Sequence, residues 1–299
     1  MIDKNPLVSV IIPTYKRSDM LIDAINSVIN QTYNNLEIIV IDDNNPDSLY
    51  RIETRDKLKS FIANNQIIYL QNECNIGGAL TRNRGIHEAK GKYIAFLDDD
   101  DYYLPTKIQK QVELIKNENV GLVYCHCNGV DEKGNILWEN LNSYEGTPLY
   151  ESMIYCIAST SLWLCDRQML LDIGGFEEMP SKQDLLLMVK IIAYGYQIRC
   201  VKDKLVNYLE HDKERITKSK ASLSIVEGWI IFRNYCRQHY NKLSKKQVRE
   251  VEYRLSRTLC LQYIKLQRRL DAVKELFKMF RSIPLRLSNF RMMLRIYTD

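Results

Sequence analysis

The sequence predicts an α/β fold in which a mostly parallel sheet is flanked by helices. Short apolar runs rich in β-branched residues alternate with longer stretches whose apolar residues recur every three or four positions. Such alternation is typical of a parallel sheet covered on both faces. The 299 residues suffice for one large or two modest domains, and 45% hydrophobic with 26% charged residues is ordinary for a folded protein.

The first strand and helix are expected at 7–14 and 18–30. The first segment, LVSVIIPT, is apolar, β-branched and stopped by Pro13, which is typical of a buried strand. The second segment places apolar residues at helical spacing. The pattern then repeats along the chain. Further strands are expected at 36–41, 66–70, 93–97 and 120–125, and further helices at 48–64, 79–90 and 105–117.

The loops after three of these strands are expected to form one ligand site. Ligands of open α/β sheets bind beyond the carboxyl ends of the strands, which places the loops after Thr14, Ile41 and Leu97 together. Beyond Asn128 the alternation loosens at several Gly and Pro residues, which favours hairpins and loops over one end of the sheet.

Charge divides the chain into two regions. The formal net charge is −9 over the first 212 residues and +14 over the remainder. We expect a domain over 1–212, with halves of about 1–127 and 128–212, and a helical, basic C-terminal region over 213–299. A basic region of this kind attracts an anionic partner such as a membrane surface, a nucleic acid or an acidic protein.

The sequence also predicts a cytoplasmic location. It contains no run of 18 uncharged apolar residues and no basic segment leading into an apolar one at its start. The eight cysteines form no C-x-x-C pair, so they are interpreted as reduced thiols.

Four aspartates at 98–101 directly follow an apolar strand segment. Adjacent carboxylates repel one another, and a divalent cation such as Mg²⁺ or Mn²⁺ relieves the repulsion because it prefers oxygen ligands and bridges carboxylates to a diphosphate. The alternative is a solvated acidic loop that caps the helix expected after Pro105. The run by itself leaves both interpretations open.

Two further segments carry polar groups at strand or helix ends. Asp42 and Asp43 follow the strand at 36–41, where their oxygens suit a ribose hydroxyl or a base N–H, although such a pair is also common in turns. The Gly-bearing segment 75–83 enters a helix with Arg82 one turn in, which suits an anionic ligand. It has neither G-x-G-x-x-G nor a phosphate-loop Gly-Lys-Ser/Thr, which argues against a nicotinamide dehydrogenase and a P-loop NTPase.

The order and spacing of four segments carry a resemblance to a known family. The segments read VSVIIPTYKR, VIDDNNPD, NIGGALTRNRGI and AKGKYIAFLDDDD. They closely resemble the inverting glycosyltransferases of family 2, which have the GT-A fold and transfer a sugar from a nucleotide diphosphate to an acceptor hydroxyl. The resemblance is strong over 7–103 and weaker to about 211.

The resemblance implies a role for each matching residue. The residues it assigns to the nucleotide sugar are Pro13, Thr14, Tyr15, Asp42, Asp43, Arg82, Asp98 and Asp99. Asp43 would contact the base or ribose with support from Asp42, and Arg82 would lie by the diphosphate. Asp100 would bind the metal, Mn²⁺ or Mg²⁺; with four aspartates in a row, a register shifted by one residue is the alternative. His211 matches a histidine that sometimes lies beside the metal, although a lone His is more often an ordinary surface residue.

The acceptor hydroxyl needs a base, and Asp184 falls where the family has one. It follows the segment IGGFEE at 173–178, which resembles the family's Gly-Gly-Phe acceptor segment. Gln183 departs from the usual Glu, and the segment 44–46 departs from the usual Gly-Ser-Thr. The alternative for Asp184 is a helix N-cap. The run 125–127, Cys-His-Cys, is interpreted as buried strand rather than as a zinc site.

The segment 254–295 predicts an amphipathic helical region. It mixes apolar residues at helical spacing with eleven Arg or Lys. Among its apolar residues are Leu259, Leu270 and Phe277. It suits peripheral contact with an anionic membrane, and packing on the body or an oligomer contact is the alternative. Nucleic acid is not expected as a partner, because the acidic body repels phosphate and no binding motif is present.

The function predicted is a metal-dependent inverting glycosyltransferase with a UDP-sugar as the expected donor. Its acceptor would be a glycan or lipid-linked glycan, as in cell-surface polysaccharide synthesis, at the inner face of the cell membrane. The alternatives are a degenerate, glycosyltransferase-like assembly subunit and a sugar nucleotidyltransferase, the latter disfavoured because 13–17 lack Gly. The sugar and the linkage are not predicted, and both a monomer and a homo-oligomer stay open.

Overall fold

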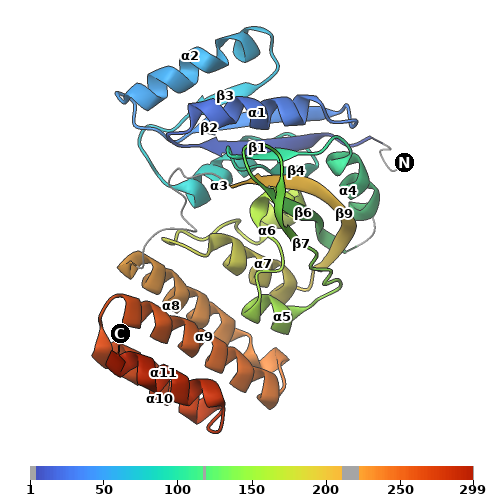
Figure 1. Cartoon of the computed structure of the whole chain (residues 1–299). Helices are drawn as coiled ribbons and strands as arrows, with labels where there is room; N and C mark the ends of the chain where they lie inside the picture. Colours follow the sequence, from blue (N-terminus) through green and yellow to red (C-terminus); the bar gives the residue numbers. More distant parts are fainter. Residues whose placement is uncertain (1–4, 117–118, 211–221, 299) are drawn as a thin grey trace. The chain divides into compact units, whose positions relative to one another are not determined.

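The computed structural model describes residues 5–116, 119–210 and 222–298. It forms two compact units (Figure 1). The first unit contains Met1–Thr147, Ile157–Glu177 and Lys190–His211. The second contains Pro148–Cys156, Glu178–Val189 and Asp212–Asp299, so the expected C-terminal region is joined there by two earlier segments.

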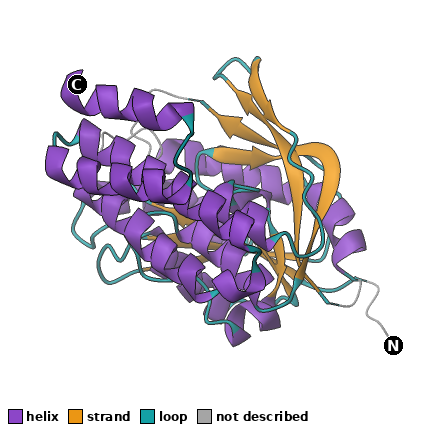
Figure 2. Ribbon diagram, turned by 90° about the horizontal axis from the view of Figure 1, so that it is seen from below, coloured by secondary structure: helices purple, strands orange, loops and turns teal. Residues whose placement is uncertain are grey.

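The first unit is built on one mixed β-sheet (Figure 2). Its strands are β1 Val8–Thr14, β2 Leu36–Asp42, β3 Ile68–Gln71, β4 Tyr93–Phe96, β5 Asp101–Tyr103, β6 Val120–Val130, β7 Ile136–Asn140, β8 Leu164–Asp166 and β9 Gln197–Leu209. The strand order is β3-β2-β1-β4-β8-β6-β9-β5, with β7 on β6. The neighbours β3, β2, β1 and β4 are parallel, as are β6 and β9. The α/β fold class is therefore confirmed, while β8, β5 and β7 pair with their neighbours in the antiparallel direction.

The helices of the first unit follow the predicted alternation. They are α1 Ser18–Ile29, α2 Leu49–Ala63, α3 Gly78–Glu88, α4 Lys107–Ile115 and α6 Arg167–Asp172, with a 3-10 turn η1 at Thr160–Leu162. The path β1-α1-β2-α2-β3 adds each new strand toward one edge of the sheet. The connection β3-α3-β4 then passes back over β2 and β1 and places β4 on the other side of β1. Because such crossovers are right-handed, α1 and α2 lie on one face and α3 on the other. The strand order thus reverses between β1 and β4, which is where ligands of open α/β sheets bind.

The second unit is helical. Its helices are α5 Leu149–Ile154, α8 Leu223–Gln238, α9 Lys245–Lys265, α10 Arg269–Ser282 and α11 Leu287–Thr298, with a 3-10 turn η3 at Tyr240–Lys242. Helix α7, Gln183–Ala193, begins in this unit and ends in the first. Among the described helices, none is both long and apolar enough to cross a bilayer.

The amphipathic region expected at 254–295 forms much of α9, α10 and α11. Part of its apolar surface is internal: Leu259 is fully buried, and Cys260, Leu276 and Met279 belong to one buried cluster. Other apolar side chains face outward, with Leu270 at 80% and Phe277 at 71% exposure. The region therefore packs within its own unit and also keeps an exposed apolar surface.

A buried ion pair joins α8 to α10, and its loss is expected to destabilise the second unit. Arg233 donates two hydrogen bonds, of 2.8 and 3.2 Å, to the carboxylate of Glu275, and both residues are buried. Glu275→Ala leaves the guanidinium buried without its partner and is expected to lower the free energy of unfolding by about 3–5 kcal/mol. Urea unfolding measures this loss. Asp56→Ala, which removes an exposed partner of Lys59, serves as control and is expected to leave the midpoint nearly unchanged.

Candidate active site

The carboxyl ends of β1, β2 and β4 meet at one edge of the sheet, as the sequence predicts. Thr14, the last residue of β1, pairs in register with Asp42 of β2. The hydroxyl of Thr14 donates a 2.8 Å hydrogen bond to Asp99, which follows β4. The backbone N–H of Asp43 donates to the carbonyl of Thr14 at 2.9 Å. The three loops after these strands are therefore held together at the point where the strand order reverses.

The four consecutive aspartates have different surroundings. Asp99 is buried and accepts from Thr14, from the backbone N–H of Tyr15 at 3.3 Å, and from Arg17 at 3.1 Å. Asp101 is buried and accepts a 2.8 Å bond from the hydroxyl of Ser161. These two carboxylates tie the loop to the rest of the unit. Burial raises the pKa of Asp99 to about 7, although the Arg17 guanidinium opposes this shift.

The other two aspartates each pair with an arginine, and of these Asp98 lies nearer to solvent. The side chain of Asp98 is 33% exposed and forms an ion pair with Arg82 of α3. Asp100 lies 2.9 Å from Arg17, which also pairs with Asp99. Two guanidinium groups thus offset the repulsion within the acidic run. Asp98 and Asp100 are the members best placed to present oxygens to a ligand.

Asp42 and Asp43 organise the neighbouring loops. Asp42 is fully buried and accepts from Asn44 and from the hydroxyl of Tyr69, while Arg51 lies 3.2 Å away. It therefore supports the loop around Asp43, and its role toward the nucleotide sugar stays a prediction. Asp43 is 4% exposed, and its carboxylate accepts from the backbone and side chains of the loop that enters α3.

The Gly-bearing loop before α3 is shaped by Asp43. The backbone N–H groups of Ile76 and Gly77 donate to its carboxylate at 2.9 Å each. Gly77 has a φ of 83°, a left-handed conformation that favours glycine. The sequence predicts that this loop offers N–H groups to an anionic ligand; in the structure, two of them bind the anion of Asp43 instead. Arg82, one turn into α3, pairs with Asp98, and its predicted contact with an anionic ligand stays a prediction.

Arg82 lies between the acidic run and the Gly-Gly-Phe segment. Its guanidinium is 5.8 Å from the ring centre of Phe176, and that ring packs edge-on against Phe96 of β4. Asn83 fixes the segment by donating to the carbonyl of Phe176 and accepting from its N–H, both at 2.8 Å. A side chain on Gly175, which has a φ of 59°, would lie 2.4 Å from Asn83. These contacts explain why a glycine directly precedes the phenylalanine.

The remaining predicted residues lie in several places. Pro13 and Tyr15 flank Thr14 at the end of β1, and the ring of Tyr15 is 41% exposed. Asp184 lies in the first turn of α7, within the second compact unit. His211 lies outside the described residues. The Cys-His-Cys run at 125–127 lies in β6 and is buried, as predicted.

Sequence reasoning missed Arg17 as a site residue. It follows the first strand and pairs with two aspartates more than 80 positions away along the chain. The one signal in the sequence is its place, three residues after Thr14, at a strand end already expected to face the acidic run. The departure at 44–46 also has an explanation: Asn44 accepts from the N–H of Lys16 and Asn45 accepts from the N–H of Asn75, so both fasten the loops around Asp43.

The carboxylates at this strand edge are of the kind that binds a divalent cation together with a diphosphate. Mg²⁺ is usually held by one or two protein carboxylates together with substrate phosphates. Asp98 and Asp100 supply carboxylate oxygens at one strand end, and each is paired with an arginine that also attracts anionic groups. Within the described ranges, no group of three or more His, Cys, Asp or Glu side chains is arranged to hold a metal alone. The remaining ligands would come from the substrate.

The fold and this strand edge define a GT-A glycosyltransferase. The sequence signature of Glycosyl transferase family 2 matches residues 9–173, more than half of the chain. The chain belongs to this family and is a glycosyltransferase. The expected family is therefore confirmed.

Two relatives and one solved structure illustrate the family. TuaG of Bacillus subtilis, a glycosyltransferase whose name refers to teichuronic acid biosynthesis, is 27% identical over 81% of this chain and 93% of its own length. WfaP of Escherichia coli, a UDP-Glc:α-D-GlcNAc-diphosphoundecaprenol β-1,3-glucosyltransferase, is 32% identical over 64% of this chain and 73% of its own. The structure of S. aureus TarS 1–349 with UDP has a TM-score of 0.66 and 17% identity, covering 97% of this chain and 88% of TarS. This last likeness concerns the fold.

Proposed function

We propose that this protein is an inverting, metal-dependent glycosyltransferase that transfers a sugar from a UDP-sugar to a hydroxyl of a lipid-linked or other glycan during cell-surface polysaccharide synthesis. The observation that carries the proposal is the joining of Thr14, Arg17 and Arg82 to the acidic run at the reversal of strand order. The name of the relative WfaP, which gives UDP-glucose as donor and a diphosphoundecaprenol-linked sugar as acceptor, supports the choice of donor and acceptor.

The donor would bind at the ends of β1, β2 and β4. Tyr15 would offer its exposed ring to the base, and Asp43, whose carboxylate already accepts from the N–H groups of Ile76 and Gly77, would contact the base or ribose from the adjoining loop. Arg82 would bind the diphosphate, since its buried Nε has no hydrogen-bond partner among the described residues. A guanidinium binds phosphate well because its planar fork of N–H groups donates to two phosphate oxygens at once, and because the two groups carry opposite charges.

The acidic run would stabilise the leaving group. Asp98 and Asp100 would hold Mn²⁺ or Mg²⁺, which when bound supplies positive charge to the departing diphosphate. Arg17 would keep Asp100 in place through the pair it makes with both Asp99 and Asp100. Asp184 would accept the proton of the acceptor hydroxyl, and attack from the face opposite the leaving group would invert the anomeric carbon.

A screen of nucleotide sugars tests the proposal. The purified chain is expected to release nucleotide from at least one UDP-sugar in a Mn²⁺-stimulated manner, and to do so faster with an undecaprenyl diphosphate-linked sugar acceptor. Calorimetry with UDP and Mn²⁺ accompanies the screen. Binding of UDP without turnover of any donor would favour the alternative of a glycosyltransferase-like assembly subunit, and failure to bind any nucleotide would refute the proposal.

The exposed apolar surface of α10 and α11 would contact an anionic membrane. Leu270, Phe277, Leu285, Leu287 and Leu294 are 65–89% exposed within the basic C-terminal region, a combination suited to lying on anionic lipid. Phe277→Glu is expected to reduce sedimentation with phosphatidylglycerol vesicles severalfold, whereas Leu49→Glu, at an exposed leucine of α2, should not. Equal sedimentation with phosphatidylcholine vesicles, or no loss for Phe277→Glu, would contradict this contact.

A further inference from the structure

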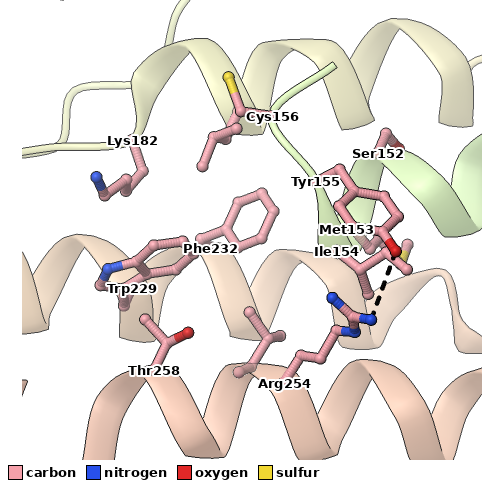
Figure 3. A pocket seen from close by; sticks show the side chains of 12 residues that line it. Ser152, Met153, Ile154, Tyr155, Cys156, Lys182, Trp229, Phe232, Arg254 and Thr258 are labelled. Carbon is pink, nitrogen blue, oxygen red and sulfur yellow. Dashed lines mark hydrogen bonds between the residues drawn. The ribbon is translucent and has the colours of Figure 1, made fainter. Parts of the chain in front are cut away.

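The second unit contains a cavity that the proposed donor site does not use. Its volume is about 240 Å³, and it is lined by residues of α5, α8 and α9 and by the chain that enters α7 (Figure 3). Pockets for drug-sized ligands start at roughly 300 Å³. The cavity is therefore of a size for one sugar ring rather than for an oligosaccharide.

Each end of the cavity has a cation beside an aromatic ring. At one end the amine of Lys182 lies 5.1 Å from the ring centre of Trp229. At the other end the guanidinium of Arg254 lies 5.0 Å from the ring centre of Tyr155 and donates a 3.4 Å hydrogen bond to its hydroxyl. Figure 3 shows the ring of Phe232 between these two pairs. Aromatic faces suit the apolar C–H face of a sugar, while the two cations suit a negative group attached to it.

The cavity also adjoins the residue proposed as the base. Lys182 and Leu185, which both line it, flank Asp184 in the chain. Cys156 is another lining residue, and burial, with a smaller contribution from the negative charge of Asp184, raises the pKa of its thiol to about 12. Asp184 therefore lies close to the cavity within the same unit. A ligand bound there would bring its hydroxyl groups near this carboxylate.

We propose that this cavity binds the acceptor through a single sugar ring that carries an anionic group, with Arg254 and Lys182 on the negative group and Trp229 or Tyr155 on the ring. The inference rests on the proposed function, because it concerns the acceptor of that same reaction. The negative group has two chemical sources. It is a phosphate of a lipid-linked sugar or the carboxylate of a uronic acid, and Arg recognises either one.

Binding of small probes to the full chain tests the proposal. The probes are glucose 1-phosphate, methyl glucuronide and the neutral methyl glucoside, followed by calorimetry or by ligand-observed NMR. At least one charged probe is expected to bind more tightly than the neutral one, and the tighter of the two identifies the source of the negative group. Equal binding of all three, or binding of none, would overturn the proposal.

Matched variants locate the bound probe. Arg254→Gln and Lys182→Gln are each expected to weaken the charged probe by about 10- to 100-fold, because each removes a charge-assisted hydrogen bond. Arg249→Gln makes the same change at an exposed position of the same helix as Arg254 and is expected to leave binding unaltered. Unchanged affinity in both cavity variants would place the probe elsewhere and refute the assignment.

Nucleotide binding separates this inference from the proposed function. UDP with Mn²⁺ is expected to bind Arg254→Gln as tightly as the unaltered chain, while the Michaelis constant for the acceptor rises. If UDP binds and donors turn over but the charged sugars do not bind in the cavity, the acceptor assignment fails and the proposed function stands. If UDP does not bind at all, the proposed function itself fails.

Discussion

Asp100→Ala is expected to reduce Mn²⁺-stimulated release of nucleotide from the donor at least about 1000-fold. A metal ion contributes several kcal/mol to the stabilisation of a charged leaving group, and each 1.36 kcal/mol corresponds to a factor of ten in rate. Asp100 pairs with Arg17, and its removal leaves Asp98 as the partly exposed carboxylate of the acidic run. Nucleotide release measured against Mn²⁺ concentration gives the rate and the apparent metal affinity.

The control for this variant is Asp203→Ala. Asp203 is an exposed carboxylate on β9 that pairs with Lys110 at 2.9 Å, and surface pairs of this kind contribute little to stability. It is expected to keep the full rate and the same Mn²⁺ dependence. If Asp100→Ala folds normally and retains its metal-stimulated rate, Asp100 does not bind the metal and the role assigned to it is wrong.

The fold was predictable from sequence wherever local pattern decided it. The β-branched run of β1 and the helical spacing of α1 are local signals, and both elements lie where they were expected. β8 is different, because its three residues separate β4 from β6 in the sheet. So short a strand has no periodicity of its own, and only its pairing with two distant strands creates it. β8 was missed for this reason, whereas the antiparallel hairpin of β6 and β7 lies beyond Asn128, where hairpins were expected.

The sequence predicted which residues share the strand edge of the candidate site better than it predicted how their side chains are arranged. Strand-end position was enough to bring Thr14 and the acidic run to the same edge. Four identical neighbours, however, give no local signal of which carboxylate is buried. Asp99 turns inward because it accepts a hydrogen bond from Thr14, which lies 85 positions earlier in the chain. Asp101 turns inward because it accepts one from Ser161, which lies 60 positions later. Such long-range partners cannot be read from one segment.

Asp184→Asn is expected to keep donor binding and to lose sugar transfer by about 100- to 10,000-fold. General base catalysis contributes a factor of this size, and an amide of nearly the same shape cannot take up the acceptor proton. The measurement is twofold: calorimetry with UDP and Mn²⁺, and formation of glycosylated product from donor and acceptor. Unimpaired transfer would remove Asp184 from the mechanism and leave it with a structural role at the first turn of α7.

A substitution at Gln183 supplies a second test of Asp184. Its result, a shift in the pH dependence, is not expected if the role of Asp184 is purely structural. The side chain of Gln183 donates a 2.8 Å hydrogen bond to the carbonyl of Met179, and it carries no charge next to the proposed base. Gln183→Glu adds a negative charge there, which disfavours the ionised form of Asp184 and raises its pKa. Since the base works only when ionised, the acidic limb of the pH dependence of kcat/KM should move to higher pH. An unmoved limb would mean that transfer does not depend on the ionisation of Asp184.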